Sequence, residues 1–281
     1  MRRIMSTTIR KKLTLIIIGA LVLLFNLGPI LWGVLGSLRP RDEIMRYPPE
    51  PIPSTLGIEH YRTITEGGFL PAAQASLIYA VVTVFAALIA GSLAAYALDR
   101  IRFVGRSVVM FLVLAGIPLA SGAAALIVPT YLYMVKLGLN DTVFVLPLVY
   151  IAYNLPTAVW VLRGALGGLS SELDEAAAID GAGRLRTLFE ILLPLCKPAI
   201  GAAALFCFVG AWNEFVAGSV LVDNPDLRPI QVSIYQNMGY FGRDWGPLLA
   251  SATLAIVPII IAFLIFGRLL ISGLTKGAVK G

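Results

Sequence analysis

The chain alternates between long apolar stretches and shorter polar ones. Six apolar stretches approach or exceed the roughly 20 residues that a helix needs to cross a bilayer, and charged or proline-rich segments separate them. The spans are predicted at about residues 13–38, 72–98, 107–135, 142–162, 198–222 and 247–270. This pattern predicts an all-α, polytopic transmembrane protein with a single transmembrane domain over 13–270, a tail over 1–12 and a tail over 271–281.

The first and third predicted spans have features of their own. The apolar run from Leu13 to about Leu38 is too long for the core of a signal peptide, so we read it as a retained span. The third stretch contains Pro118 and Pro129. Proline lacks the backbone N–H of a helix interior, so this span is predicted to be kinked or interrupted.

Composition excludes a soluble domain. The chain is 58% hydrophobic and only 14% charged, with a mean hydropathy of +0.85, whereas roughly a quarter of the residues in soluble domains are charged. The net charge of +6 does not indicate nucleic-acid binding, because the basic residues are dispersed at the ends of the predicted spans.

The distribution of lysine and arginine predicts the orientation in the membrane. With the N-terminus inside, inner segments hold fifteen of the 22 basic residues and outer segments hold seven. An excess of lysine and arginine marks the cytoplasmic side. Both termini and the polar segment 171–194 are therefore predicted to be cytoplasmic, while 39–70, 136–141 and 223–246 are external.

The segment Ser171–Pro194, which reads SELDEAAAIDGAGRLRTLFEILLP, is a long polar stretch between two apolar ones. Ser171 is a candidate N-cap, and the acidic residues after it suit the first turn of a helix. Gly181 and Gly183 are expected to end that helix. A second helix is predicted from Arg184 to Leu193, with one apolar face made of Leu185, Leu188, Phe189 and Leu192.

The sequence offers no catalytic or metal-binding constellation. His60 is the single histidine, and Cys196 and Cys207 have a spacing that fits no metal site. No Gly-x-x-x-x-Gly-Lys-Ser/Thr phosphate loop occurs. We therefore predict a protein that is not an enzyme and holds no metal or other cofactor.

The polar segment carries a family resemblance. Glu175-Ala176-Ala177, then Gly181, then Ile191-Leu192-Leu193-Pro194 resembles the EAA motif of binding-protein-dependent ABC importer permeases. The resemblance is to the carbohydrate branch and its maltose-type, six-span subunit, and it covers most of the chain. Further similar stretches are 91–98, 136–139, 154–156, 210–215, 244–246 and 273–281. Ala75 departs from the family pattern, because many members have asparagine before the serine that corresponds to Ser76 of the second span.

The resemblance implies the permease fold, a cytoplasmic coupling helix and a role in an ATP-driven importer of a carbohydrate or related polyol. It implies a place in the bacterial cytoplasmic (inner) membrane, among membrane lipid. The implied partners are a second permease subunit in a heterodimer, an ATPase dimer that binds ATP and Mg, an extracytoplasmic sugar-binding protein and the carbohydrate substrate. No nucleic acid is implied.

The same resemblance implies which residues dock the ATPase. The set is Glu175, Ala176, Ala177, Asp180, Gly181, Leu185 and Pro194, with Lys276 and Lys280 of the tail as further contacts. Composition alone equally favours an ordinary helical loop with solvated charges. The tail equally suits a solvated basic segment near anionic headgroups.

A candidate substrate path combines polar and aromatic residues inside the predicted fourth and fifth spans. It consists of Tyr150, Tyr153, Asn154, Trp212, Asn213 and Glu214. Sugars need donors and acceptors that match their hydroxyls, and aromatic faces that cover their C–H patches. Packing or interface anchoring is the alternative for the aromatic residues, and a structural hydrogen bond is the alternative for Glu214.

Two other functions compete with the importer. An ion-coupled secondary transporter would need paired intramembrane acids or a proton relay, and Glu214 stands alone inside a predicted span. An intramembrane enzyme such as a metalloprotease would need a cluster of ligands or nucleophiles, which one histidine in a polar loop does not supply.

Overall fold

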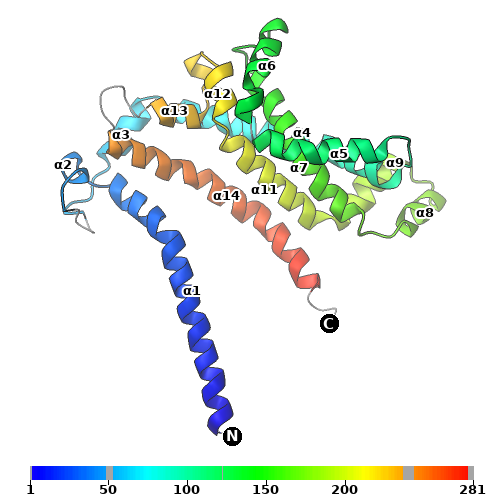
Figure 1. The fold of residues 1–281 in the computed structure, drawn as a ribbon, viewed down its shortest axis with the longest axis horizontal. Coiled ribbons are helices and arrows are strands. Elements are labelled where there is room, and N and C mark those ends of the chain that lie inside the picture. Colours follow the sequence, from blue (N-terminus) through cyan, green and yellow to red (C-terminus); the bar gives the residue numbers. More distant parts are fainter. Residues whose placement is uncertain (1, 49–52, 122, 237–243, 278–281) are drawn as a thin grey trace. The chain divides into compact units, whose positions relative to one another are not determined.

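The computed structural model describes residues 2–48, 53–121, 123–236 and 244–277, and its helices are labelled in Figure 1. Every regular element in these ranges is a helix, which confirms the all-α class. The helices are α1 (Arg2–Ser37), α2 (Arg41–Ile44), α3 (Glu59–Glu66), α4 (Phe69–Arg100), α5 (Arg106–Ser121), α6 (Ala123–Lys136), α7 (Val145–Leu166), α8 (Glu172–Ile179), α9 (Arg184–Arg186), η1 (Thr187–Leu192), α10 (Leu193–Leu195), α11 (Lys197–Trp212), α12 (Val216–Leu221), η2 (Pro225–Leu227), α13 (Ile230–Gln236) and α14 (Trp245–Gly277).

The chain divides into two compact units. The N-terminal unit combines Met1–Phe69 with Gln236–Ile256, and the core unit combines Leu70–Tyr235 with Val257–Gly281. The boundaries fall inside or beside α4 and α14, so each of these helices continues from one unit into the other. The candidate coupling surface and the candidate substrate path both belong to the core unit.

Four helices of the described residues are long and apolar enough to cross a membrane unaided. They are Lys12–Ser37, Phe69–Arg100, Val145–Leu166 and Trp245–Leu270. They coincide with the predicted first, second, fourth and sixth spans. The predicted third span consists of two shorter helices, α5 and α6, as its prolines suggested, and the predicted fifth is divided into α11 and α12. The count of six spans stays a prediction.

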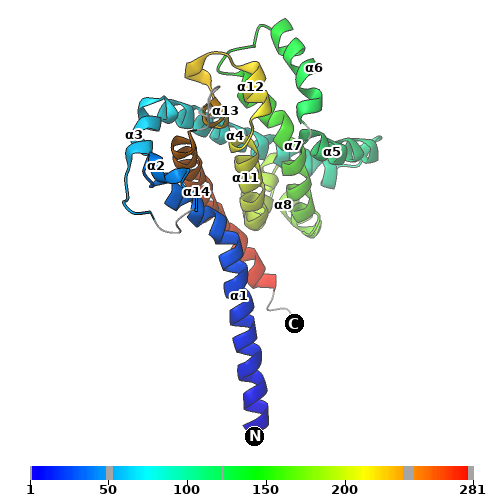
Figure 2. The same ribbon diagram turned by 60° about the vertical axis from the view of Figure 1, so that its left-hand side comes forward.

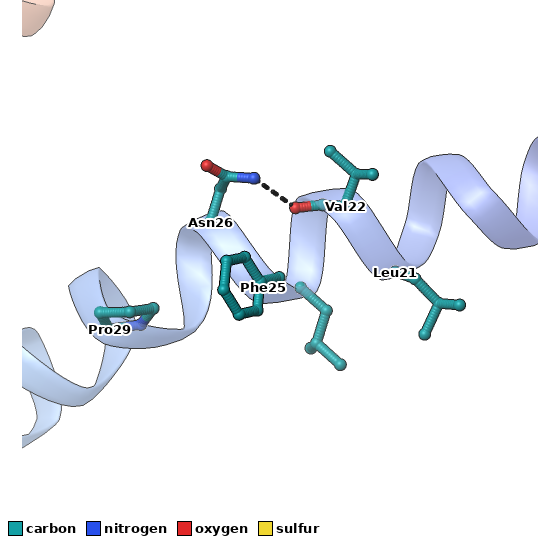
Figure 3. A pocket seen from close by; sticks show the side chains of 6 residues that line it. Leu21, Val22, Phe25, Asn26 and Pro29 are labelled. Carbon is teal, nitrogen blue, oxygen red and sulfur yellow. Dashed lines mark hydrogen bonds between the residues drawn. The ribbon is translucent and has the colours of Figure 1, made fainter.

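Helix α1 presents an unusually bare apolar surface. Every side chain from Lys12 to Leu27 is exposed. Figure 3 shows Phe25 and Leu21 extending from the helix, while the Asn26 amide donates a 2.8 Å hydrogen bond to the carbonyl of Val22. This back-bond satisfies a polar side chain within its own helix, which a lipid environment requires. The surface of α1 therefore suits contact with lipid or with another apolar helix.

The predicted external loop over 39–70 is partly folded in the N-terminal unit. His60 on α3 is buried, and its Nε2 lies 2.8 Å from the carbonyl oxygen of Arg39. Gly246 approaches the imidazole so closely that a side chain there would overlap it. Ser37 and Tyr61 share a further hydrogen bond of 2.6 Å. Tertiary packing, rather than helix propensity, gives this polar segment its order.

The core unit is built around α7 and α11, which pack together and lie side by side in both views (Figures 1 and 2). Small residues allow helices of this unit, including α4 and α7, to pack closely, because a glycine or alanine lets two backbones approach. A Cβ added to Gly91 of α4 would lie 3.1 Å from the Cβ of Ala158 on α7. In α11, Ala203 and Ala204 are likewise buried.

Candidate coupling surface and substrate path

Helix α8 carries the first half of the polar segment. Glu172, Asp174 and Glu175 lie in its first turn, where the helix dipole favours negative charge. The predicted cap is wrong in detail: Ser171 has helical backbone angles and its side chain makes no capping hydrogen bond. Instead, the hydroxyl of Ser170 accepts from the backbone N–H of Glu172 at 3.3 Å. The start of this helix depends on the preceding serine.

Gly181 ends α8, as predicted. Its φ is +75°, a left-handed conformation that glycine adopts without steric cost. The N–H of Ala182 donates to the carbonyl of Ala177 at 2.8 Å, and the N–H of Gly181 donates to that of Ala178 at 3.1 Å. These two bonds form a Schellman motif. Gly183, by contrast, is extended at φ −72° and serves as the N-cap of α9.

The second half of the segment is helical but differs from the predicted amphipathic helix. It runs through α9, the π-helical η1 and α10. Leu188 and Leu192 are fully buried, whereas Leu185 is 63% exposed and Phe189 is 44% exposed. A π-helical turn closes hydrogen bonds from i to i+5, so the residues that share its inner face depart from the α-helical spacing. The predicted four-residue apolar face is therefore only half directed inward.

The exposed residues of this segment form a candidate surface for a partner. Six of the seven residues proposed for docking are exposed: Glu175, Ala176, Asp180, Gly181, Leu185 and Pro194. Ala177 is buried and holds α8 against the core unit. Ile179 was not in the predicted docking set, and it is 87% exposed at the end of α8. An isolated apolar residue after three alanines gives no periodic signal, so its exposure appears only in the structure.

A packed apolar layer supports the exposed face from beneath. Leu188 and Leu192 of the polar segment 171–194, the candidate coupling segment, are buried with Leu162 and Leu166 of α7 and with Ala95 of α4. At Cys196 the chain turns, and the helical stretch Arg184–Leu195 meets α11 at 89°. The segment is thus fixed to three helices of the core unit.

The charged side chains of the second half point outward. Arg186 Nε donates to Glu190 Oε2 at 2.8 Å across one turn. This hydrogen bond raises the pKa of the already cationic Arg186. Both side chains are largely exposed, so the pair adds little stability and belongs to the exposed face of the candidate surface.

The candidate substrate path lies where α7 meets α11, and two of its residues are buried. Tyr150 packs edge-on against Tyr79, with ring centroids 6.4 Å apart. Trp212 is stacked on Phe208 with centroids 5.9 Å apart. The structure therefore gives both rings a packing role in this conformation.

The polar members of the path lie nearer the surface. Tyr153 and Asn154 are half-buried and Asn213 is exposed. The Asn154 amide donates to the carbonyl of Tyr150 at 2.8 Å, which leaves its side-chain oxygen as an acceptor. Gln231 bridges the break after α11, donating at 3.3 Å to Asn213 Oδ1 and to the Trp212 carbonyl. These groups can offer hydrogen bonds to a hydroxylated ligand.

Glu214 caps the short helix α12. Its two carboxylate oxygens accept from the backbone N–H groups of Ala217 at 2.8 Å and Gly218 at 3.2 Å. Glu214 therefore makes a structural hydrogen bond of the kind that the sequence analysis offered as the alternative to substrate contact. It caps α12, the second half of the divided fifth span.

Replacement Glu214→Ala is expected to destabilise the protein by about 1–2 kcal/mol, because two N–H groups at the start of α12 lose their acceptor. The midpoint of thermal unfolding in detergent should fall by a few degrees. Glu214→Gln keeps one acceptor oxygen and should lose less. An alanine variant as stable as the parent would show that the cap contributes nothing.

The tail residues proposed as ATPase contacts are mostly beyond the structural description. Lys276 falls within α14, but its side chain is outside the described part. Lys280 lies outside the described residues altogether. Helix α14 continues beyond the predicted end of the sixth span, so the tail begins as helix.

Comparison with known proteins adds a family and a fold. Residues 84–276 match the family model described as "Binding-protein-dependent transport system inner membrane component". The chain is 34% identical to the trehalose/maltose transport system permease protein MalG of Thermococcus litoralis, over 99% of this chain and 100% of that protein. It is 32% identical to the diacetylchitobiose uptake system permease protein DasC of Streptomyces coelicolor, over 94% and 96% respectively.

A solved structure is similar in fold. A chain from the crystal structure of a bacterial ABC transporter involved in import of the acidic polysaccharide alginate aligns with a TM-score of 0.77. The alignment covers 94% of this chain and 97% of that chain at 24% sequence identity. At this identity the likeness supports the fold of the chain, and its cargo does not carry over.

Proposed function

The chain belongs to the family of inner membrane components of binding-protein-dependent transport systems, a family of non-catalytic permease subunits, and we propose that it forms half of the membrane path of an ATP-driven carbohydrate importer. A second permease subunit supplies the other half, and a separate ATPase dimer binds ATP and Mg. The external binding protein delivers the substrate. Both termini and the coupling segment face the cytoplasm.

The observation that carries this proposal is the exposed coupling segment on a rigid base. Ile179 and Leu185 are apolar and largely exposed, while Leu188 and Leu192 anchor the same segment to the core unit. Apolar groups exposed beside charged ones are typical of protein interaction sites. An ATPase partner that docks on this surface would supply the energy for transport.

The substrate class follows from the relatives. Proteins similar to this one along nearly their whole length are named for transport of trehalose and maltose or of diacetylchitobiose. We infer a carbohydrate or related polyol as the substrate. Asn154 and Asn213 supply amide donors and acceptors for its hydroxyls, and the ring of Tyr153 supplies a face for its C–H groups. Tyr150 and Trp212 support these groups from the buried layer.

The exposed apolar surface of α1 supports a second membrane subunit. A span with bare side chains from Lys12 to Leu27 gains packing against another apolar helix, because dispersion contacts and lipid release drive helix association in bilayers. The other arrangement open to α1 is contact with lipid alone. A heterodimer places the substrate path between two permeases.

Transport requires two global states of the assembly. ATP favours the closed form of the ATPase dimer, and the coupling segments move with it, so the path opens outward toward the binding protein. Hydrolysis restores the inward-facing state. ATP at the ATPase and the loaded binding protein at the external face both shift the equilibrium between these two states, and the two binding sites are coupled through it.

Co-expression with an ATPase, a second permease and a sugar-binding protein of the same transporter family from the same genome should yield a four-component system. We expect the ATPase to co-purify with this chain, and the loaded binding protein to raise ATP hydrolysis in proteoliposomes. Sugar uptake should require ATP. An ion gradient that drives uptake without ATP would overturn the proposal in favour of a secondary transporter, and failure of the ATPase to associate would overturn the coupling role.

A further inference from the structure

On the basis of the proposed function, we propose that Arg100 is a positioning residue that connects the coupling segment to the cytoplasmic ends of α4 and α7. Through this connection, displacement of α8 by the docked ATPase moves both spans together. Arg100 is the last residue of α4. It is remote from the docking surface in sequence and was not among the residues that the sequence pointed to for coupling.

The guanidinium of Arg100 meets groups from three helices or their ends. Its Nε lies 3.1 Å from Asp174 Oδ2 on α8, an ion pair whose N–H direction departs from hydrogen-bond geometry. Its Nη2 donates to the carbonyl of Leu169 at 2.9 Å and to that of Leu166 at 3.4 Å. Its Nη1 lies 3.4 Å from Asp99 Oδ2. One side chain thus joins α4, the end of α7 and the first turn of α8.

The electrostatics of the helix ends favour a cation at this point. The carbonyls at the C-terminus of a helix carry partial negative charge, and Leu166 is the last residue of α7. The acidic first turn of α8 adds Asp174. Arg100 and Asp174 side chains are only 16% and 21% exposed, so solvent screens their interaction less than it would at the surface. A planar guanidinium can bond several of these acceptors at once, which an ammonium group cannot.

Asp174 has a second connection to α4. The hydroxyl of Tyr96 donates to Asp174 Oδ1 at 3.1 Å, so each carboxylate oxygen is engaged by a different side chain of the same helix. The ring of Tyr96 packs against the buried layer beneath the coupling segment, as does Leu173 of α8. Two points of attachment fix the orientation of α8 as well as its position.

The ends of α4 and α7 pack closely, and little space remains between them. A Cβ added to Gly167, which follows α7, would lie 3.2 Å from Asp99 Oδ1 and 3.3 Å from the Arg163 carbonyl. The Arg106 guanidinium donates to the Asp99 carbonyl at 3.1 Å, which holds the turn after α4 in place. The junction is therefore compact, and a displacement of α8 cannot be absorbed by slack between these parts.

Arg100→Gln tests the proposal in the full complex, reconstituted with its ATPase, second permease and binding protein. The variant keeps a polar side chain and loses the charge and the fork of donors. We expect the amount of co-purified ATPase to stay near the parent level, while the number of substrate molecules transported per ATP hydrolysed falls about fivefold or more, within the usual range of coupling between sites. The transport ratio of Arg100→Lys should lie between those of the parent and of Arg100→Gln.

Arg102→Gln is the matched control, because Arg102 is exposed in the same short segment after α4. It should leave both assembly and the transport ratio unchanged. Tyr96→Phe removes one hydroxyl from the same carboxylate and should lower the ratio mildly without affecting assembly. If Arg100→Gln fails to fold, the transport ratio of Tyr96→Phe tests the positioning role instead.

The outcomes separate this inference from the proposed function. If the parent complex couples ATP to uptake and both Arg100→Gln and Tyr96→Phe keep its ratio, the positioning role is wrong and the importer stands. If Arg100→Gln only lowers the amount of complex, and Tyr96→Phe transports at the parent ratio, the cluster is a folding brace and the inference is overturned. A parent complex without ATP-dependent uptake would overturn the proposed function itself.

Discussion

Gly181→Asp is expected to abolish ATPase-coupled uptake. The residue has a φ of +75° and lies on the exposed side of the coupling segment. A residue with a side chain at this angle costs about 1–2 kcal/mol within the turn, and aspartate adds a second negative charge beside Asp180 on the surface proposed to meet the ATPase. The added side chain and charge should lower affinity for the ATPase about tenfold or more, which corresponds to a loss of about 1.4 kcal/mol of binding free energy. Co-purification and uptake in vesicles measure the loss.

Gly105→Asp controls for backbone strain. Gly105 also has a positive φ, of +88°, and no atom lies within 4 Å of the position that its Cβ would occupy. It lies in the turn between α4 and α5, outside the coupling segment. The same substitution there should leave ATPase association near the parent level. If Gly181→Asp supports full ATP-coupled uptake, the docking role assigned to this surface is wrong.

Gly201→Leu is expected to prevent the core unit from packing. A Cβ at this position of α11 would lie 2.7 Å from the Leu269 Cβ and 3.0 Å from the Phe266 carbonyl oxygen, both on α14. Backbone atoms of a helix cannot move aside as a side-chain end can, so the helices must separate. Overpacking of this kind costs about 1–3 kcal/mol and occasionally more. We expect a strongly reduced yield of folded protein from membranes.

Gly164→Leu provides the matched comparison within a neighbouring helix. Gly164 lies in α7, and no atom lies within 4 Å of the position of an added Cβ. A leucine there should be tolerated, with a yield and an unfolding midpoint close to those of the parent. Equal yields for the two variants would show that the close approach of α11 and α14 has no part in stability.

Much of the fold followed from local sequence. The all-α class and the positions of the four long apolar helices follow from hydropathy alone, because a bilayer requires long apolar stretches whose backbone groups bond internally. The divided third span followed from its prolines. The turn at Gly181 followed from the intrinsic freedom of glycine. Each of these features depends on a few neighbouring residues, so each can be read without knowledge of the tertiary structure.

Other features of the candidate site could not be read in this way. The serine that assists the start of α8 is Ser170 rather than Ser171, because the path of the chain between α7 and α8 decides which hydroxyl reaches the N–H group. The π-helical turn over Thr187–Leu192 changes which leucines face inward. Glu214 was recognised as unusual from its place in an apolar stretch, but its role as the cap of α12 needed the break in that span.

The sequence by itself determined that this is a multi-pass helical membrane protein with an EAA-type segment, because the apolar runs and the segment's residues lie next to one another along the chain. The tertiary structure decided how that segment is held. Tyr96 and Asp174 are 78 positions apart, and Arg100 meets Asp174 only because α4 and α7 end where α8 begins. Packing of helices brings such charges together, and no local pattern of residues encodes that meeting.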